Sequence, residues 1–157
     1  NKHNCTIYGL SLQLQDNELV VVDEKAGADG VSTGIITGVD VGVIVCEPTL
    51  HSVKTAKQIA GLMQFYGTPY VFVANKVTSS EDKDFIAEEL GQEPVVFLMQ
   101  SANMKRNPCA LVSEWTDELA EVFKQAKALN QNDRLERTVS KFERNKDFAE
   151  APQVSTC

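Results

Sequence analysis

The sequence predicts an α/β fold in which a three-layer parallel sheet carries helices on both faces. Two observations predict it. Four short, mostly apolar runs, at residues 20–22, 41–46, 69–76 and 94–99, lack the polar alternation of half-exposed strands. Helical patterns lie between the later runs, and strands that alternate with helices form parallel sheets. The chain has 157 residues, of which 43% are hydrophobic, and this suffices for about one domain with a sizeable core.

The first half of the chain contains two of these runs and one helix. Val20 to Val22 predicts a strand buried on both faces, which ends at Asp23 and leads into a glycine-rich loop at residues 27–38. Residues 41–46 predict a second strand, ended by Pro48. The next helix should be capped by Thr49 or Ser52 and closed by Gly67. Its expected apolar face consists of Val53, Ala56, Ile59, Ala60, Met63 and Phe65.

The second half continues the alternation. A third strand is expected at residues 69–76, a helix capped by Ser79 or Ser80 at residues 79–91, and a fourth strand at residues 94–99. Residues 101–108 are expected to form a loop. A long helix is predicted at residues 111–129, through Trp115, Leu119, Val122 and Phe123. A charged helix should follow at residues 133–148, and then a loose tail.

Composition excludes several classes of function. The net charge of −7 argues against nucleic acid as a partner, because nucleic-acid binders usually carry a basic face. The sequence has no apolar run long enough to cross a bilayer, so we expect no membrane partner. The four cysteines are far apart in sequence, and no CxxC pair occurs, which favours a reducing, cytoplasmic location.

Three groups of polar residues follow predicted strands, where parallel sheets bind their ligands. Asp23 offers a hard oxygen ligand for Mg²⁺, and Gly27 lets the backbone approach a phosphate closely. Glu47 and Pro48 end the second strand. Asn75 has both a donor and an acceptor for a purine edge, and the stem of Lys76 can lie along a base. Two of the groups also have a purely structural interpretation: a turn after Asp23, and an Asx-type turn at Asn75.

Taken together, in this order and at this spacing, the three groups are more specific evidence for a function than any one of them alone. The run "VVVDEKAGADGVSTGIITGVDVGVIVCEPTLHSVKTAKQIAGL", followed by "VFVANKV" and "EDKDFIAEELG", resembles the CooC-type members of the MinD/ParA-like P-loop ATPases. Those proteins help to insert nickel into carbon monoxide dehydrogenase. The resemblance covers roughly residues 19 to 100. The matching residues are Asp23, Ala26, Gly27, Gly34, Gly38, Asp40, Glu47, Pro48, Thr49, Ser52, Ala56, Asn75 and Lys76.

The resemblance implies a P-loop NTPase-like fold that binds ATP and Mg²⁺ and acts in metal-cofactor maturation. Asp23 would lie near Mg²⁺ and, with Gly27, take part in catalysis. Residues 24–34 would form a switch loop that senses the γ-phosphate. The residues implied at the nucleotide are Ala26, Gly27, Glu47, Pro48, Asn75 and Lys76. The resemblance also implies a homodimer, a client metalloenzyme such as carbon monoxide dehydrogenase, and Ni²⁺ or Zn²⁺ at the dimer interface.

The chain departs from the family at three places; at one of them, in the switch loop, it has Lys25 and Asp29 where the family often has Glu. It has no G-x-x-x-x-G-K-[ST] phosphate loop, so we expect the fold to be incomplete at the N-terminus and ATP hydrolysis to be poor in this chain alone. Only Cys5 stands where the family has a Cys-x-Cys metal site. We expect residues 1–130 to be a partial nucleotide-binding domain, and residues 131–157 a charged helix with its tail.

Three other interpretations stay open. The chain could be a non-catalytic interaction or scaffold module that lacks the phosphate loop. It could be a MinD/ParA-like positioning ATPase, although its acidic balance disfavours DNA and membrane roles. It could also be a receiver-like signalling domain, with Asp23 as phospho-acceptor and Lys76 as the cation. That domain needs an acidic pair near its first strand, and "NKHNCTIYG" lacks one.

Overall fold

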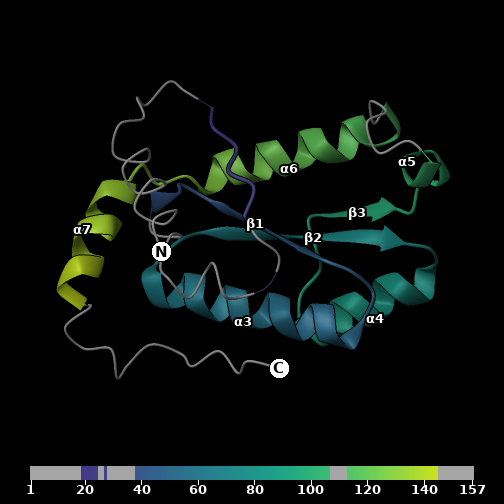
Figure 1. Ribbon diagram of the computed structural model, residues 1–157, viewed down its shortest axis with the longest axis horizontal. Coiled ribbons are helices and arrows are strands. Elements are labelled where there is room, and N and C mark those ends of the chain that lie inside the picture. Colours follow the sequence, from purple (N-terminus) through teal and green to yellow (C-terminus); the bar gives the residue numbers. More distant parts are fainter. Residues whose placement is uncertain (1–18, 25–26, 28–37, 107–112, 145–157) are drawn as a thin grey trace. The chain divides into compact units, whose positions relative to one another are not determined.

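The computed structural model describes residues 19–24, 27, 38–106 and 113–144 (Figure 1). Its sheet has three parallel strands, β1 (Gly42–Cys46), β2 (Tyr70–Val77) and β3 (Val96–Met99), in the order β1-β2-β3. Helix α3 (Leu50–Tyr66) connects β1 to β2, and α4 (Ser80–Leu90) connects β2 to β3. The predicted α/β fold is confirmed, with the strand–helix alternation of Rossmann-like and P-loop-like proteins.

The chain divides into two compact units. The described residues of the first are 19–24, 27, 38–42, 58–69 and 130–144. The second contains residues 43–57 together with the described part of 70–129, and therefore most of the sheet. Helices α5 (Ala102–Arg106) and α6 (Thr116–Leu129) belong to the second unit, and α7 (Arg134–Arg144) belongs to the first.

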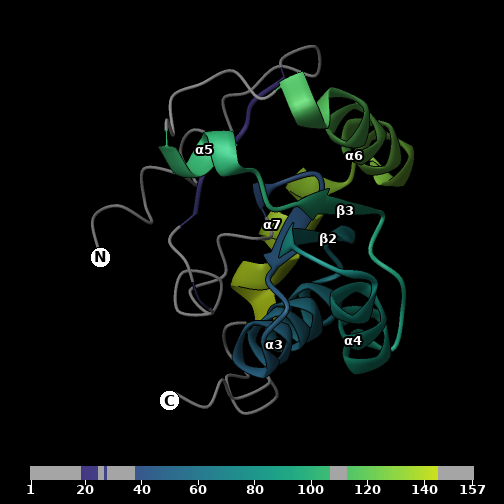
Figure 2. The same cartoon turned by 90° about the vertical axis from the view of Figure 1, so that its right-hand side faces the viewer.

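The second unit buries both faces of β2. On one face, Val71 and Val73 pack with the β3 residues Val96 and Leu98 and with Val122 of α6. The alternate residues Phe72 and Ala74 are also buried, and α4 contacts β2. Figure 2 shows α4 and α6 on opposite sides of the sheet, so this unit has the predicted three layers.

Strand β1 is less completely covered than β2. Ile44 and Cys46 are buried, whereas the intervening Val43 and Val45 are 45% and 55% exposed. Their alternation shows that one face of β1 packs into the core while the other meets solvent. In the sheet formed by the described residues, β1 is also an edge strand.

Local sequence signals explain where α3 and α4 begin and end. At the start of α3, the Ser52 N–H donates to Oγ1 of Thr49 over 3.2 Å, and Gly67 follows the helix with a φ of 74°. The Asp82 N–H donates to Oγ of Ser79, which is the N-cap of α4. Gly91 then ends α4 in a left-handed conformation.

Three sequence predictions for these elements are wrong. Residues 19–24 form no strand, and Leu19 and Val21 are 78% and 76% exposed, because no described strand supplies hydrogen-bond partners for them. Residues 102–106 are helical, since none of them breaks a helix. The helix predicted at residues 111–129 begins at Thr116, after a 3₁₀ turn over Ser113–Trp115, and its Phe123 is 51% exposed.

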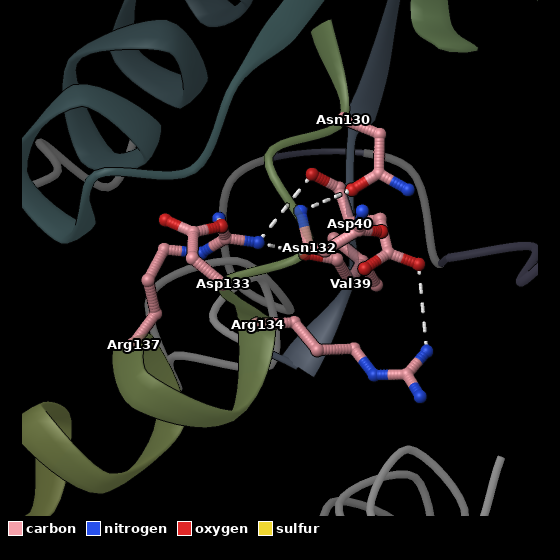
Figure 3. Close-up of polar contacts among 7 residues, drawn as sticks. All are labelled: Val39, Asp40, Asn130, Asn132, Asp133, Arg134 and Arg137. Carbon is pink, nitrogen blue, oxygen red and sulfur yellow. Dashed lines mark hydrogen bonds and ion pairs between the residues drawn. The ribbon is translucent and has the colours of Figure 1, made fainter. Parts of the chain in front are cut away.

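A buried arginine joins two segments of the first unit (Figure 3). Arg137 of α7 has a side chain only 7% exposed, and it forms an ion pair with Asp133. Its guanidinium donates to the backbone oxygen of Val39 over 2.7 Å and to that of Asp40 over 3.4 Å. Arg134 also pairs with the Asp40 carboxylate, at 3.4 Å. These contacts hold the chain just before β1 against the start of α7.

Candidate functional site at the strand ends

The structure brings together two of the predicted site groups, at the carboxyl ends of β1 and β2. Nζ of Lys76 lies 2.5 Å from Oε1 of Glu47. The two side chains are 57% and 42% exposed, so the pair is accessible to a ligand from solvent. Pro48 and Asn75, each half-buried, are the chain neighbours of this pair. Four of the predicted site residues therefore share one edge of the sheet.

Asn75 and Lys76 form a bulge in β2 instead of following the strand. Val73 and Ala74 pair with Val96 and Phe97, but the next pair is Val77 with Met99. Two residues of β2 therefore oppose the single residue Leu98. Lys76 has a φ of 57°, which is uncommon for a residue other than glycine.

The side chain of Asn75 bonds to the next residue and does not form the predicted Asx-type turn, in which it would accept from the N–H two residues on. Its Oδ1 accepts the backbone N–H of Lys76 over 2.9 Å. The amide nitrogen Nδ2 has no partner among the described residues. This arrangement leaves an amide donor at the edge of the sheet, close to the ion pair.

The start of α3 fixes the Glu47–Pro48 corner. The backbone N–H of Glu47 donates to Oγ of Ser52 over 2.9 Å. The backbone carbonyl oxygen of Glu47 accepts the N–H of Thr49 over 2.7 Å. Ser52 therefore holds the corner, while Thr49 caps the helix. The sequence suggested both residues only as caps, since a hydroxyl five positions from its partner leaves no recognisable pattern.

Asp23 and Gly27 lie in the first unit, whereas Glu47 and Asn75 lie in the second. Asp23 is exposed, and Gly27 has a φ of 98°, the positive value expected of a glycine in a turn. Beside Asp23, the Oε1 atom of Glu24 is buried and has no hydrogen-bond partner among the described residues. Asp23 and Glu24 are neighbours in sequence, and carboxylate oxygens are the ligand type that a hard cation such as Mg²⁺ prefers.

The described residues do not fit a nickel or zinc site. They contain no group of three or more His, Cys, Asp or Glu side chains that could hold a metal ion. Cys46 is buried, and burial raises the pKa of its thiol to about 11, so it stays a neutral thiol and not a metal-binding thiolate. Cys5 and Ala26 lie outside the described residues, as does most of the predicted switch loop.

None of the helices in the described part of the chain is both long and apolar enough to cross a bilayer.

Comparison with known proteins gives three partial matches. An uncharacterised ATP-binding protein of Methanocaldococcus jannaschii is 33% identical over 113 residues, which cover 71% of this chain and 45% of that protein. The carbon monoxide dehydrogenase accessory protein CooC of Rhodospirillum rubrum is 35% identical over 99 residues, 59% of this chain and 38% of CooC. A second uncharacterised ATP-binding protein of M. jannaschii is 31% identical over 121 residues, 71% of this chain and 47% of that protein.

The chain spans less than half the length of the curated relatives that it matches. No family model matches it, and no solved structure matches it. Over part of its length, the chain is therefore a distant relative of ATP-binding proteins that include a carbon monoxide dehydrogenase accessory protein.

Proposed function

We propose that this chain is the distal part of an ATP-binding and ATP-hydrolysing protein that matures a metal cofactor. The observation that carries the proposal is the cluster at the ends of β1 and β2, where Glu47, Lys76 and Asn75 lie together. Ligands of parallel α/β sheets bind at this edge. Two relatives of the chain are named as ATP-binding proteins, and their alignments cover most of it.

In this proposal, Asn75 contacts the base with its amide, and the stem of Lys76 lies along the ring. Glu47 and Pro48 shape the end of β1 beside the nucleotide. These roles agree with the accessibility of the Glu47–Lys76 pair and with the unpartnered amide nitrogen of Asn75. A neutral amide and a lysine stem supply donors and apolar contact, both of which a purine requires.

Asp23 would hold Mg²⁺ through its carboxylate, with the nucleotide phosphates and water as the other ligands. Mg²⁺ neutralises phosphate charge during hydrolysis. Ala26 and Gly27 would belong to the switch loop at residues 24–34. Since phosphoryl transfer requires a positioned phosphate cradle, the missing G-x-x-x-x-G-K-[ST] loop would have to come from elsewhere in a longer protein.

The maturation role rests on the similarity to CooC. Hydrolysis would then drive a homodimer between two states through the switch loop and release a client metalloenzyme. Nickel or zinc would be cargo at the dimer interface, with Cys5 as a ligand. The division into a nucleotide-binding part at residues 1–130 and a charged helix with its tail at residues 131–157 also stays a prediction.

The test is nucleotide binding by the natural full-length protein. Calorimetry should detect ATP in the presence of Mg²⁺, and Asn75→Ala should weaken ATP binding about tenfold, because one hydrogen-bonding group is lost. Asp23→Ala should abolish turnover while the protein remains folded. Lys54→Ala, an exposed lysine on α3, is the matched control and should bind ATP as the unmodified protein does. Absence of ATP binding would overturn the proposal.

A non-catalytic scaffold function is the second candidate. A scaffold would keep the sheet and its covering helices but bind no nucleotide. The calorimetric test therefore separates the two functions, because ATP binding by the natural protein excludes a nucleotide-independent scaffold.

A further inference from the structure

The conformation of Lys76 is the most unusual backbone feature of the candidate site. Lys76 is one of two residues other than glycine that have a positive φ among the described residues, and it lies within a strand. The left-handed conformation offers a lysine no intrinsic energetic advantage. Residues other than Gly, Asn and Asp rarely adopt it. The surrounding contacts must therefore hold it, and such positions are concentrated at functional sites.

Two contacts hold Lys76 in place. Its backbone N–H donates to Oδ1 of Asn75 over 2.9 Å, and its ammonium lies 2.5 Å from Oε1 of Glu47, the residue that follows β1. The register shift between Ala74 and Val77 lets β2 resume its pairing with β3 beyond the bulge. Lys76 is thus bonded both to its chain neighbour Asn75 and to Glu47 at the carboxyl end of β1.

This arrangement determines which way the amide of Asn75 faces. A backbone N–H only donates, so the atom that meets the Lys76 N–H must be the amide oxygen. The amide nitrogen is then directed away from that bond and keeps its two hydrogens for another acceptor. Without the bulge, the strand would alternate, and Asn75 would share the face of Val73, which packs into the core.

We propose that Lys76 is a positioning residue: its left-handed backbone, secured by Glu47, orients Asn75 to donate to a ring nitrogen of a purine base. The inference rests on the proposed function and deepens it. Lys76 acts here mainly through its backbone, and the ion pair with Glu47 serves to hold that backbone. The site would accordingly select the base of the nucleotide and contribute little to binding of its phosphates.

The experiment uses the natural full-length protein and measures two affinities by calorimetry with Mg²⁺, for ATP and for inorganic tripolyphosphate. Their ratio reports recognition of the base. Lys76→Val should lower the ATP affinity about tenfold, because a β-branched residue resists positive φ, and should leave tripolyphosphate affinity unchanged. Lys76→Gly, which adopts positive φ readily, should restore most of the ratio.

Glu47→Gln provides a second variant, which keeps the size of the side chain and removes the ion pair. Because this pair is exposed, we expect only about a threefold loss of ATP affinity, again with tripolyphosphate unaffected. Lys54→Val controls for the loss of an exposed lysine and should change neither affinity. If Lys76→Val fails to fold, the Lys76→Gly and Glu47→Gln ratios still decide the matter.

The outcomes separate this inference from the proposed function. If the unmodified protein does not bind ATP, the proposed function fails. If it binds ATP but Lys76→Val keeps the unmodified ratio, the positioning role is refuted. If Lys76→Gly loses as much base recognition as Lys76→Val, the lysine side chain and not the backbone recognises the base, and the inference is overturned.

Discussion

Replacing Arg137 with methionine tests whether a buried guanidinium holds the first unit together. The side chain is 7% exposed and contacts the Asp133 carboxylate and the backbone oxygen of Val39. Burial lowers the pKa of Arg137, whereas the nearby Asp40 carboxylate raises it. The guanidinium therefore keeps its charge, although burying that charge costs free energy of desolvation. Methionine fills much of the same space but has no donors, so the substitution removes polar contacts and preserves most of the packing.

The expected loss of stability follows from these contacts. A hydrogen bond to a charged group contributes about 1.5–3 kcal/mol, and an oxygen left buried without a partner costs about 1–3 kcal/mol. The substitution also removes the cost of burying the guanidinium charge, whose Nε has no hydrogen-bond partner among the described residues. This gain offsets part of the lost stability. We therefore expect Arg137→Met to lower the free energy of unfolding by about 3 kcal/mol.

Urea unfolding followed by far-ultraviolet circular dichroism measures this change. If the variant keeps the native fold, the urea concentration at the midpoint of unfolding should fall. The dependence of the unfolding free energy on urea concentration should stay unchanged. Arg106→Met is the matched control: Arg106 is exposed on α5, and its replacement should change stability by no more than about 0.5 kcal/mol. If Arg137→Met falls within that same range, the reasoning about the buried cluster is refuted.

Three further predictions concern the second unit. Hydrogen bonds from the Thr78 side chain and backbone lower the pKa of Asp82, so its stabilising effect should be complete at neutral pH and lost as the pH falls through that lowered value. Asp82→Asn should thus destabilise at neutral pH, and its difference from the unmodified protein should shrink as the pH falls, as urea titrations over a series of acidic pH values would show. Cys46, buried with its pKa raised to about 11, should resist alkylation until urea unfolds the chain, and mass spectrometry would reveal early labelling if this is wrong. Ile86→Ala should cost about 2–5 kcal/mol because Ile86 is fully buried, and Phe123→Ala should cost less; equal losses in denaturant would contradict the core assignment.

The sequence predicted the elements whose signals are local. Ser79 and Gly91 bound α4 by caps that lie within a few residues of the helix, and Gly67 ends α3 for the same reason. The run at residues 19–22 was misinterpreted because apolar character indicates only a tendency to be buried. Whether such a run becomes a strand depends on a partner strand elsewhere in the chain.

The proximity of Glu47 and Lys76 was predictable from the sequence, but the local geometry around them was not. The order of strands and helices placed Glu47 and Lys76 on one edge, and the structure brings them into contact. The bulge at Asn75 was not predicted, because it is defined by the register of β3 and not by residues 75–76 themselves. Arg137 was missed for a similar reason: its partner Val39 is 98 positions away.

The open side of β1 has a consequence for how copies of this chain behave together. Among the described residues β1 is an edge strand, and its Val43 and Val45 are exposed; an unpaired strand edge is a surface on which another strand can add. The net charge of −7 opposes this at neutral pH, because like-charged copies repel one another. Near the isoelectric point of about 4.8 that repulsion vanishes, and the same edge then favours aggregation.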